Sequence, residues 1–343
     1  MNQPKLLIIG PSWVGDMVMA QSLFKTILNQ SPNTLIDVIA PEWSLAVTKR
    51  MPEVNKGIVS PIKHGELGIM KRFHLSEWIR PNKYDRAIVM TRSWKAALIP
   101  WFAGIPVRTG YRGEMRYFLI NDMRTMDTKV LNQTVKRFVA LGSLSNQLPV
   151  IEPPSLSVSN ENIATMIETL NLNLKKPIMA IMPGAEYGPA KQWPSDYFAE
   201  VAQTYLSKGW NVCILGSAKD SQVAVEIKAL LHKKNSNGLY DLTGKTTLLD
   251  AIDFLSLSNI ALTNDSGLMH IAAAVDTPLL ALYGPTNPEF TPPLSKKAKV
   301  LRKTNGYIRD RKGPGRKGYH ESLLKLRPQE VLNELEVFIK ESQ

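Results

Sequence analysis

The stretch Gly10-Pro-Ser-Trp-Val-Gly-Asp16 joins an apolar run to an amphipathic one near the start of the chain. Thr263-Asn-Asp-Ser-Gly-Leu-Met-His270 does the same in the second half. Each pattern is typical of a tight turn that carries a carboxylate from the end of a strand into the start of a helix. Ligands bind at that edge in open α/β sheets. The two stretches therefore predict an α/β protein in which each half supplies one carboxylate to a shared site.

Apolar, β-branched runs recur along the chain, with helical patterns between them. This alternation predicts parallel sheets that are covered by helices on both faces. We expect strands at residues 5–9, 35–40, 58–59, 86–90 and near Val107, and again at 178–182, 211–215, 239–242, 260–263 and 279–283. Helical patterns occupy residues 17–28, 195–207, 218–233, 248–256 and 268–274, and residues 328–339 predict a closing helix.

The chain has 343 residues, which is enough for two domains of ordinary size. The proline cluster in residues 147–155 disfavours both a helix and a central strand, so we place the break there. The predicted fold is α/β with two Rossmann-like domains, residues 1–160 and 176–320, whose parallel sheets face each other across a cleft. Residues 321–343 are expected to form a helix that packs back toward the first domain.

The composition excludes several classes of protein. With 44% hydrophobic and 21% charged residues, the chain is expected to be an ordinary soluble protein. Its one cysteine, Cys213, excludes a disulfide framework and a cysteine-rich metal site, and fits the cytoplasm. The five histidines are scattered without metal-ligand spacing, so we expect no metal site. We also expect neither a signal peptide nor a membrane span.

The formal net charge of +12 is unevenly distributed. Residues 1–150 hold 20 Lys and Arg against 10 Asp and Glu, residues 151–301 hold 12 against 14, and residues 302–317 hold 7 against 1. This asymmetry predicts an anionic partner for the first half, which could be nucleic acid, a membrane or a phosphorylated substrate. The alternative is a solvated surface. No nucleic-acid-binding motif is present, and aromatic residues are not interleaved with the basic ones.

Three loops in the second half have features of a nucleotide site. Residues 183–194 are rich in Gly and Pro between a strand and a helix, which suits a phosphate, and Lys191 could supply a positive charge. Asp220 could accept hydrogen bonds from a ribose diol or cap a helix. The turn around Thr246 could present backbone groups to a base edge, or a Thr in this turn could cap the following helix.

The two opening motifs allow both functional and structural interpretations. Asp16 is either a helix-dipole carboxylate, stabilising by about 0.3–1 kcal/mol, or a general base aimed at an acceptor hydroxyl. Asp265 would face sugar hydroxyls, while the turn Ser266-Gly267 would present backbone N–H groups to a diphosphate. His270 lies one helical turn later, and it could be either a functional residue or a buried core histidine.

These motifs, together with Tyr283-Gly-Pro-Thr286, resemble the heptosyltransferases of glycosyltransferase family 9 over essentially the whole chain. The resemblance implies a GT-B fold, inversion at the anomeric carbon and no bound metal. It implies transfer of L-glycero-D-manno-heptose from ADP-heptose onto the first heptose of the lipopolysaccharide inner core. The acceptor would be a phosphorylated heptosyl-Kdo-lipid A, and the protein would be peripheral on the cytoplasmic face of the inner membrane.

The resemblance also implies roles for individual residues. Asp16 would be the general base. The donor-binding residues would be Lys191 for the phosphates, Asp220 for ribose, the backbone at Thr246 for adenine, Asp265 for heptose, Ser266 and Gly267 beside the diphosphate, and His270. The acceptor-binding residues would be Ser12, Trp13, Lys63, Arg92, Arg112 and Arg116, with His64, Lys71, Arg72, Lys95 and Arg108 as further candidates.

The chain departs from the family pattern at one place. Glu186-Tyr187 stands where the family's first-heptose enzyme has a Thr pair, so backbone N–H groups could replace its phosphate contacts. Three alternatives stay open. They are a first- or third-heptose transferase, a sugar-nucleotide epimerase on the same fold, and a basic nucleic-acid-binding protein. The basic first half argues against the epimerase, which needs no such acceptor face.

Overall fold

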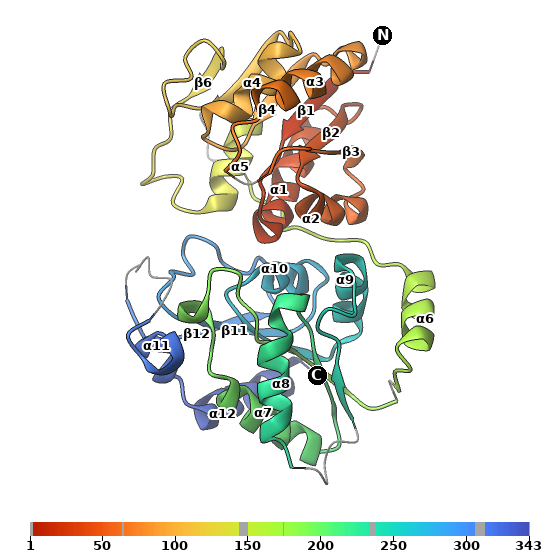
Figure 1. The fold of residues 1–343 in the computed structure, drawn as a ribbon, viewed down its shortest axis with the longest axis vertical. Coiled ribbons are helices and arrows are strands. Elements are labelled where there is room, and N and C mark those ends of the chain that lie inside the picture. Colours follow the sequence, from red (N-terminus) through yellow and green to blue (C-terminus); the bar gives the residue numbers. More distant parts are fainter. Residues whose placement is uncertain are drawn as a thin grey trace. The chain divides into compact units, whose positions relative to one another are not determined.

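The computed structural model describes residues 3–63, 65–143, 150–173, 175–232, 238–305 and 313–342. The chain divides into two compact units, Met1–Ser155 and Leu156–Gln343. In Figure 1 the first unit runs from red to yellow and the second from green to blue. Each unit contains one six-stranded sheet in which every strand pair is parallel, so the predicted α/β class is confirmed.

The first sheet has the strand order β3-β2-β1-β4-β5-β6. Its strands are β1 (Lys5–Ile9), β2 (Leu35–Ala40), β3 (Val54–Val59), β4 (Arg86–Val89), β5 (Val107–Tyr111) and β6 (Asp122–Arg124). Its helices are α1 (Val14–Gln30), α2 (Glu42–Leu45), α3 (Ile69–Ile79), α4 (Trp94–Phe102) and α5 (Thr134–Gly142), with 3₁₀ helices η1 (Ala46–Arg50) and η2 (Arg80–Asn82). Helices α3 and α4 pack side by side, and so do α1 and α5 (Figure 1).

The second sheet has the strand order β12-β11-β10-β7-β8-β9. Its strands are β7 (Ile178–Met182), β8 (Asn211–Ile214), β9 (Leu239–Asp241), β10 (Ile260–Asn264), β11 (Leu279–Tyr283) and β12 (Ala298–Arg302). Its helices are α6 (Asn160–Thr169), α7 (Ser195–Ser207), α8 (Ser221–Leu230), α9 (Leu248–Leu257), α10 (Gly267–Ala274), α11 (Glu321–Leu324) and α12 (Pro328–Ser342). The described 3₁₀ helices are η3 (Pro189–Lys191), η4 (Ala218–Asp220) and η6 (Arg316–Gly318).

Both sheets are wound in the same way. In each, the second and third strands along the chain lie on one side of the first strand, and the fourth strand lies on its other side. The strand order therefore reverses between β1 and β4, and between β7 and β10. At such a reversal the loops leave neighbouring strands in opposite directions, so a ligand-binding crevice forms outside the carboxyl ends of those strands. Both opening motifs of the sequence follow strands at these two positions.

The sequence analysis located the inner strands to within a few residues but missed β6 and β12. Both missed strands lie at sheet edges, and every residue of each is only partly buried. An edge strand has a neighbour on one side only, so it needs no continuous apolar run. The apolar-run criterion therefore finds inner strands and overlooks these two.

The break between the units lies within the predicted proline-rich segment. Residues before the break pack on α1, where Gln21 Nε2 donates to the Ser155 carbonyl at 2.7 Å and Ser22 Oγ to the Glu152 carbonyl at 2.6 Å. Helix α6 belongs to the second unit, because the Asn162 side chain donates to the carboxylates of Asp250 and Asp253 on α9. The first unit thus ends at Ser155.

The closing helix α12 belongs to the second unit, and its buried face lies in the core of that unit. The expected packing of residues 321–343 toward the first domain stays a prediction. Val331, Leu335 and Phe338 recur at helical spacing and share that core with α7. An ion pair of 2.5 Å between Lys208 and Glu336 also joins the two helices.

This placement predicts a selective loss of stability. Leu335→Ala should lower the free energy of unfolding of the second unit by roughly 2–5 kcal/mol, because the substitution leaves a cavity in a closed core. Amide hydrogen exchange should therefore rise in peptides from β7–β11 and stay unchanged in peptides from β1–β5. Val337→Ala on the exposed side of the same helix is the control and should cost less than about 0.5 kcal/mol. Equal loss of protection in both units would contradict the assignment.

Candidate active site

The strand reversal of the second sheet brings two predicted residues together. Lys191 follows β7 and Asp265 follows β10, and the Lys191 ammonium lies 2.7 Å from the Asp265 carboxylate. Both side chains are mostly buried. The Lys191 ammonium also lies 5.4 Å from the centre of the Tyr187 ring. Two loops that are far apart in the sequence thus place a cation and an anion in direct contact at the carboxyl edge.

Asn264 holds the Lys191 loop in place. This fully buried side chain donates to the Pro183 carbonyl at 2.7 Å and accepts from the Trp193 backbone N–H at 2.9 Å. It therefore binds both ends of the loop that contains Lys191. The Trp193 side chain is fully buried as well, and its indole N–H donates to the Leu326 carbonyl at 2.8 Å. The lysine is thus presented by a loop that is anchored at two points.

Helix α10 begins beside the Lys191–Asp265 pair. Ser266 is its N-cap residue and makes no side-chain capping hydrogen bond, and Gly267 is its first residue. The first N–H groups of a helix have no partner within the helix and carry partial positive charge. Asp265, Ser266 and Gly267 therefore form the turn that the sequence predicted, with backbone donors next to a lysine. This combination suits a diphosphate.

His270 is a buried, neutral residue of α10. The pKa of its imidazole is lowered to about 4, chiefly by burial; the nearby Asp265 opposes this shift and Lys191 adds to it. At neutral pH the ring is therefore uncharged and can serve only as a neutral hydrogen-bonding group. The sequence analysis left open that His270 is a buried core histidine, and the structure agrees with this because the ring lies in the core.

Asp220 has the capping role that the sequence left open. Its carboxylate accepts from both the backbone N–H and the hydroxyl of Ser217, at 2.8 Å each. It also lies against the loop after β7, since a Cβ added at Gly184 would be 2.2 Å from Asp220 Oδ1. A side chain at position 184 would therefore displace this carboxylate. The contact places Asp220 at the same sheet edge as the loop that contains Lys191.

Thr246 lies in the turn after β9, and its hydroxyl donates weakly to the Leu242 carbonyl at 3.4 Å. Thr246 does not cap α9. Thr247 does so instead, through a reciprocal pair of hydrogen bonds with Asp250. The backbone around Thr246 thus follows β9, the third strand of the second unit along the chain.

The sequence analysis gave no role to Thr286. This buried residue follows β11 in the motif Tyr283-Gly-Pro-Thr286, and within the described residues its hydroxyl has no hydrogen-bond partner. The neighbouring Gly284 lies against the Lys191 loop, because a Cβ added there would be 3.4 Å from the Ala190 carbonyl. A buried hydroxyl without a partner costs free energy, so it is a candidate for a ligand contact. The sequence shows the motif, but only the structure shows that the buried Thr286 hydroxyl has no hydrogen-bond partner within the described residues.

Asp16 lies in the first turn of α1, directly after β1 and at the strand reversal of the first sheet. The turn before it is held by α2. The Trp43 indole donates to the Ser12 carbonyl at 2.7 Å, and the Ser44 hydroxyl donates to the Pro11 carbonyl at 3.1 Å. Trp13 is the N-cap residue, and its side chain is exposed. Asp16 therefore follows a turn whose backbone is fixed from a neighbouring element.

The predicted acceptor-binding cations fall into two groups. Arg116 is only 1% exposed and donates to the carbonyls of Tyr111, Thr91 and Ser93, so it is a structural residue. Its guanidinium is hydrogen-bonded inside the unit, and its assignment to an acceptor stays a prediction without support from these contacts. Arg72 and Arg108 likewise donate to backbone carbonyls, and Lys71 pairs with Glu66 at 2.7 Å.

The second group is exposed. Lys63, Arg92 and Arg112 are exposed, and Arg112 lies over the Tyr117 ring with 5.8 Å to its centre. Arg92, from the loop after β4, lies against Gly113, since a Cβ added there would be 3.3 Å from its Nε. The structure thus brings Arg92 next to the Arg112 loop at the edge where Asp16 lies. Lys95 is partly buried in α4. His64 lies outside the described residues.

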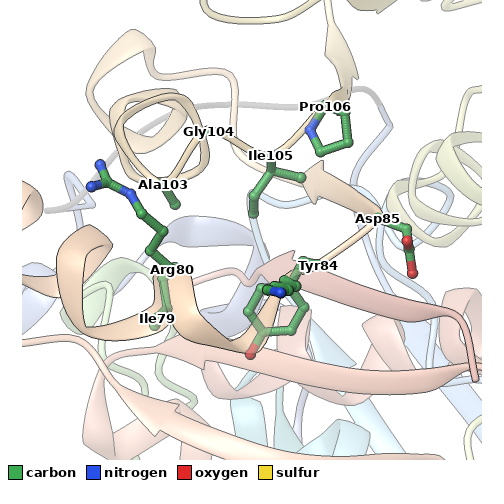
Figure 2. Close-up of a pocket in the computed structure, with 9 residues that line it drawn as sticks. Ile79, Arg80, Tyr84, Asp85, Ala103, Gly104, Ile105 and Pro106 are labelled. Carbon is green, nitrogen blue, oxygen red and sulfur yellow. The ribbon is translucent and has the colours of Figure 1, made fainter. Parts of the chain in front are cut away.

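A cavity of about 480 Å³ lies elsewhere, at the amino edge of the first sheet. Figure 2 shows residues that line it, among them Arg80, Tyr84 and Ile105. Tyr84 and Asp85 come just before β4, so this cavity is on the edge opposite Asp16. Among the described residues, no group of three or more His, Cys, Asp or Glu side chains is arranged to hold a metal ion.

Comparison with known proteins identifies the family. The model of glycosyltransferase family 9 (heptosyltransferase) matches residues 72–318. The lipopolysaccharide heptosyltransferase 2 of Salmonella typhimurium is 46% identical, over 98% of this chain and 99% of that protein. The chain belongs to glycosyltransferase family 9. It is therefore a heptosyltransferase, as the motifs predicted.

Solved structures agree with this assignment. The chain is similar to E. coli ADP-heptose LPS heptosyltransferase II, with a TM-score of 0.89, 42% identity and coverage of 98% of this chain and 99% of that one. A family 9 glycosyltransferase from Veillonella parvula, 19% identical, shares the fold with a TM-score of 0.86 and covers 99% of this chain. The heptosyltransferase described here thus has the GT-B fold that the sequence predicted.

The buried position of Arg116 leads to a first prediction for the site. Arg116→Ala should destabilise the first unit by roughly 2–4 kcal/mol, because one buried and two partly buried carbonyls lose their donor. Arg112→Ala, at an exposed position four residues earlier, should change the free energy of unfolding by less than about 0.5 kcal/mol. Urea denaturation of the two variants measures the difference. Equal stability of the two variants would contradict the structural role of Arg116.

His270 leads to a prediction about pH. Its pKa is about 4 in the folded protein against a reference value of 6.5, so the unfolded chain takes up a proton first as the pH falls. The imidazole therefore contributes stability above pH 6.5 that is lost between pH 6.5 and 4, by about 3 kcal/mol. Thermal unfolding across this range should be less pH-dependent in His270→Gln than in the wild type. Parallel losses in both proteins would show that His270 is not the cause.

Proposed function

We propose that this heptosyltransferase transfers L-glycero-D-manno-heptose from ADP-heptose onto the first heptose of the lipopolysaccharide inner core. The observation that carries the proposal is the Lys191–Asp265 pair beside the start of α10, at the strand reversal of the second sheet. The names of the relatives support the choice of sugar and acceptor, since two lipopolysaccharide heptosyltransferases 2 are 46% and 44% identical over nearly their full length.

The proposed donor site uses the second unit. Lys191 and the first N–H groups of α10 hold the diphosphate, and Asp265 accepts hydrogen bonds from heptose hydroxyls. Asp220 binds the ribose, and the backbone at Thr246 contacts adenine. Ser266, Gly267 and the neutral His270 line the same edge. The Thr286 hydroxyl, which has no partner within the described residues, adds a donor to this site.

The ion pair between Lys191 and Asp265 has a consequence for this site. The lysine assigned to phosphate and the aspartate assigned to heptose neutralise each other at 2.7 Å. A diphosphate competes with Asp265 for the lysine, and heptose hydroxyls then satisfy the carboxylate. Binding of the two parts of the donor is therefore coupled through one contact. ADP alone lacks the hydroxyls that compensate Asp265.

The proposed chemistry needs one base and a stabilised leaving group. Asp16 takes the proton from the acceptor hydroxyl as that oxygen attacks C1 of the heptose from the face opposite ADP. The bond between C1 and the diphosphate oxygen breaks, and the configuration at C1 inverts. Lys191 and the α10 N-terminus stabilise the charge that develops on ADP.

The acceptor is proposed to bind the first unit. Ser12 and Trp13 lie in the turn before Asp16, and the exposed cations Lys63, Arg92 and Arg112 suit a phosphorylated substrate. The acceptor, a heptosyl-Kdo-lipid A, is anchored in a membrane. We therefore propose that the enzyme works as a peripheral protein on the cytoplasmic face of the inner membrane. None of the described helices combines the length and apolarity needed to cross a bilayer.

A panel of purified core acceptors with no, one or two heptoses tests the proposed function. With ADP-heptose as donor, transfer should occur to the acceptor that has one heptose. A preference for the acceptor without heptose would indicate a first-heptose enzyme, and a preference for two heptoses would indicate a third-heptose enzyme. Either result would refute the proposed acceptor.

Asp16→Asn provides the sharpest test of the mechanism. Loss of a positioned base should lower the rate of transfer by about 10²–10⁴-fold. Affinity for ADP-heptose, measured by calorimetry, should stay near that of the wild type, because the donor residues are all in the second unit. Glu42→Gln is a matched control, since Glu42 is an exposed acid in the first turn of α2. Near-normal turnover of a folded Asp16→Asn enzyme would remove Asp16 from the mechanism.

A further inference from the structure

Helix α3 has apolar residues on both its buried and its exposed surface. One side is buried and places Leu75 and Ile79 in the core of the first unit. The exposed surface of the helix includes the apolar Ile69, Met70 and Phe73 beside the polar Lys71, His74 and Glu77. Amphipathic surface helices normally present polar residues to water, and large exposed apolar patches mark interaction sites. Packing in the core of the first unit therefore does not account for the apolar residues on the outer side of α3.

Helix α4 extends the exposed apolar surface. Phe73 meets Phe102 at the end of α4 with 5.5 Å between ring centres, and Phe102 meets Trp101 at 5.0 Å. Trp101 is 44% exposed, Trp78 is 57% exposed and Met70 is 62% exposed. We call the surface formed by Ile69, Met70, Phe73, Trp78 and Trp101 the α3–α4 face.

Positive charges flank the α3–α4 face. The Lys56 ammonium lies 5.0 Å from the centre of the Trp78 ring, and the Arg80 guanidinium donates to the Phe102 carbonyl at 2.7 Å. Lys83 is exposed, and together with Arg80 it lines the cavity shown in Figure 2. Arg80 also pairs with Glu77 at 2.6 Å, and the exposed Lys56 and Lys83 carry the other positive charges. Tryptophan side chains beside lysine and arginine are typical of surfaces that bind the headgroup region of an anionic membrane.

The face also has a useful position. Helices of a parallel α/β sheet begin at the carboxyl edge, so the start of α3 lies at the same edge of the sheet as Asp16. From there α3 and α4 run together toward the amino edge (Figure 1). A membrane on this face would therefore reach the edge where the acceptor is proposed to bind.

We propose that the α3–α4 face docks the first unit onto an anionic lipid bilayer, with its aromatic side chains among the headgroups and its lysines on anionic lipids. Charge favours a bilayer over a second copy of this chain, because two such faces would bring excess positive charges together. The proposal deepens the proposed function, on which it rests for the origin of the acceptor. Lipid binding can nevertheless be measured without any turnover.

Vesicle flotation tests the proposal directly. The probe is vesicles of phosphatidylcholine with about one-third phosphatidylglycerol, compared with pure phosphatidylcholine. Wild-type enzyme should bind the anionic vesicles, and added salt should weaken binding, since exposed charges are screened beyond ~8–10 Å. Met70→Gln/Trp78→Gln/Trp101→Gln should bind at least about tenfold more weakly. Lys56→Gln/Lys83→Gln should bind more weakly and show less dependence on salt.

Matched controls keep the result interpretable. Val225→Gln/Leu230→Gln changes two comparably exposed apolar residues of α8, 54% and 55% exposed, and should bind vesicles like the wild type. With a soluble acceptor that lacks acyl chains, the triple variant should turn over normally. With the acceptor embedded in anionic vesicles, its KM should rise. If all variants turn over no heptose but the triple variant still loses vesicle binding, the proposed function fails and the docking face stands.

Three outcomes would overturn the docking face. The first is vesicle binding by the triple variant that equals wild-type binding. The second is equal binding of the wild type to neutral and anionic vesicles, which would remove the role of charge. The third is a wild-type dimer in sedimentation velocity that the triple variant converts to monomer, because a second copy would then cover the face.

Discussion

The site proposed here depends on one topological constraint, the reversal of strand order at β1 and β4 and at β7 and β10. Right-handed crossovers place helices on opposite faces of the sheet on the two sides of each reversal, so neighbouring loops separate. In the first sheet, Asp16 and Arg92 lie after the two strands at the reversal. In the second sheet, Lys191 and Asp265 do so. Among the strands that the structure describes, no other neighbouring pair has this opening, because elsewhere consecutive connections lie on one face.

Within the second unit, the buried side-chain amide of Asn264 fixes the loop beside this opening. Asn264 satisfies both ends of the Lys191 loop from the last position of β10, one residue before Asp265. The last residue of β10 thereby fixes the Lys191 loop, and the residue directly after it supplies the carboxylate. A buried polar side chain is stable only when its hydrogen bonds are satisfied, so the loop conformation and the core are mutually dependent. The short contact between Lys191 and Asp265 follows from this arrangement.

The first unit shows why net charge is an imperfect guide to a binding surface. The excess of basic residues predicted an anionic partner, yet Arg72, Arg108 and Arg116 donate to backbone carbonyls inside the unit. Burial lowers the pKa of the Arg116 guanidinium to about 10, with the nearby Glu114 opposing the shift. Exposed cations such as Arg92 and Arg112 lie at the Asp16 edge, and Lys56 and Lys83 lie beside the α3–α4 face. A formal charge count treats all these groups alike because it contains no information about burial.

The sequence alone determined the α/β class, the inner strands and the motifs at both carboxyl edges, because apolar periodicity and turn residues are local signals. The resemblance of those motifs also gave the family. Tertiary structure decided which candidates meet, since Lys191 and Asp265 are far apart in the sequence and come together only through strand order. The tertiary structure also shows that Arg116 is buried and that α12 belongs to the second unit. It shows in addition that apolar residues of α3 are exposed. These properties depend on which surfaces are buried by distant segments, and no local pattern records that.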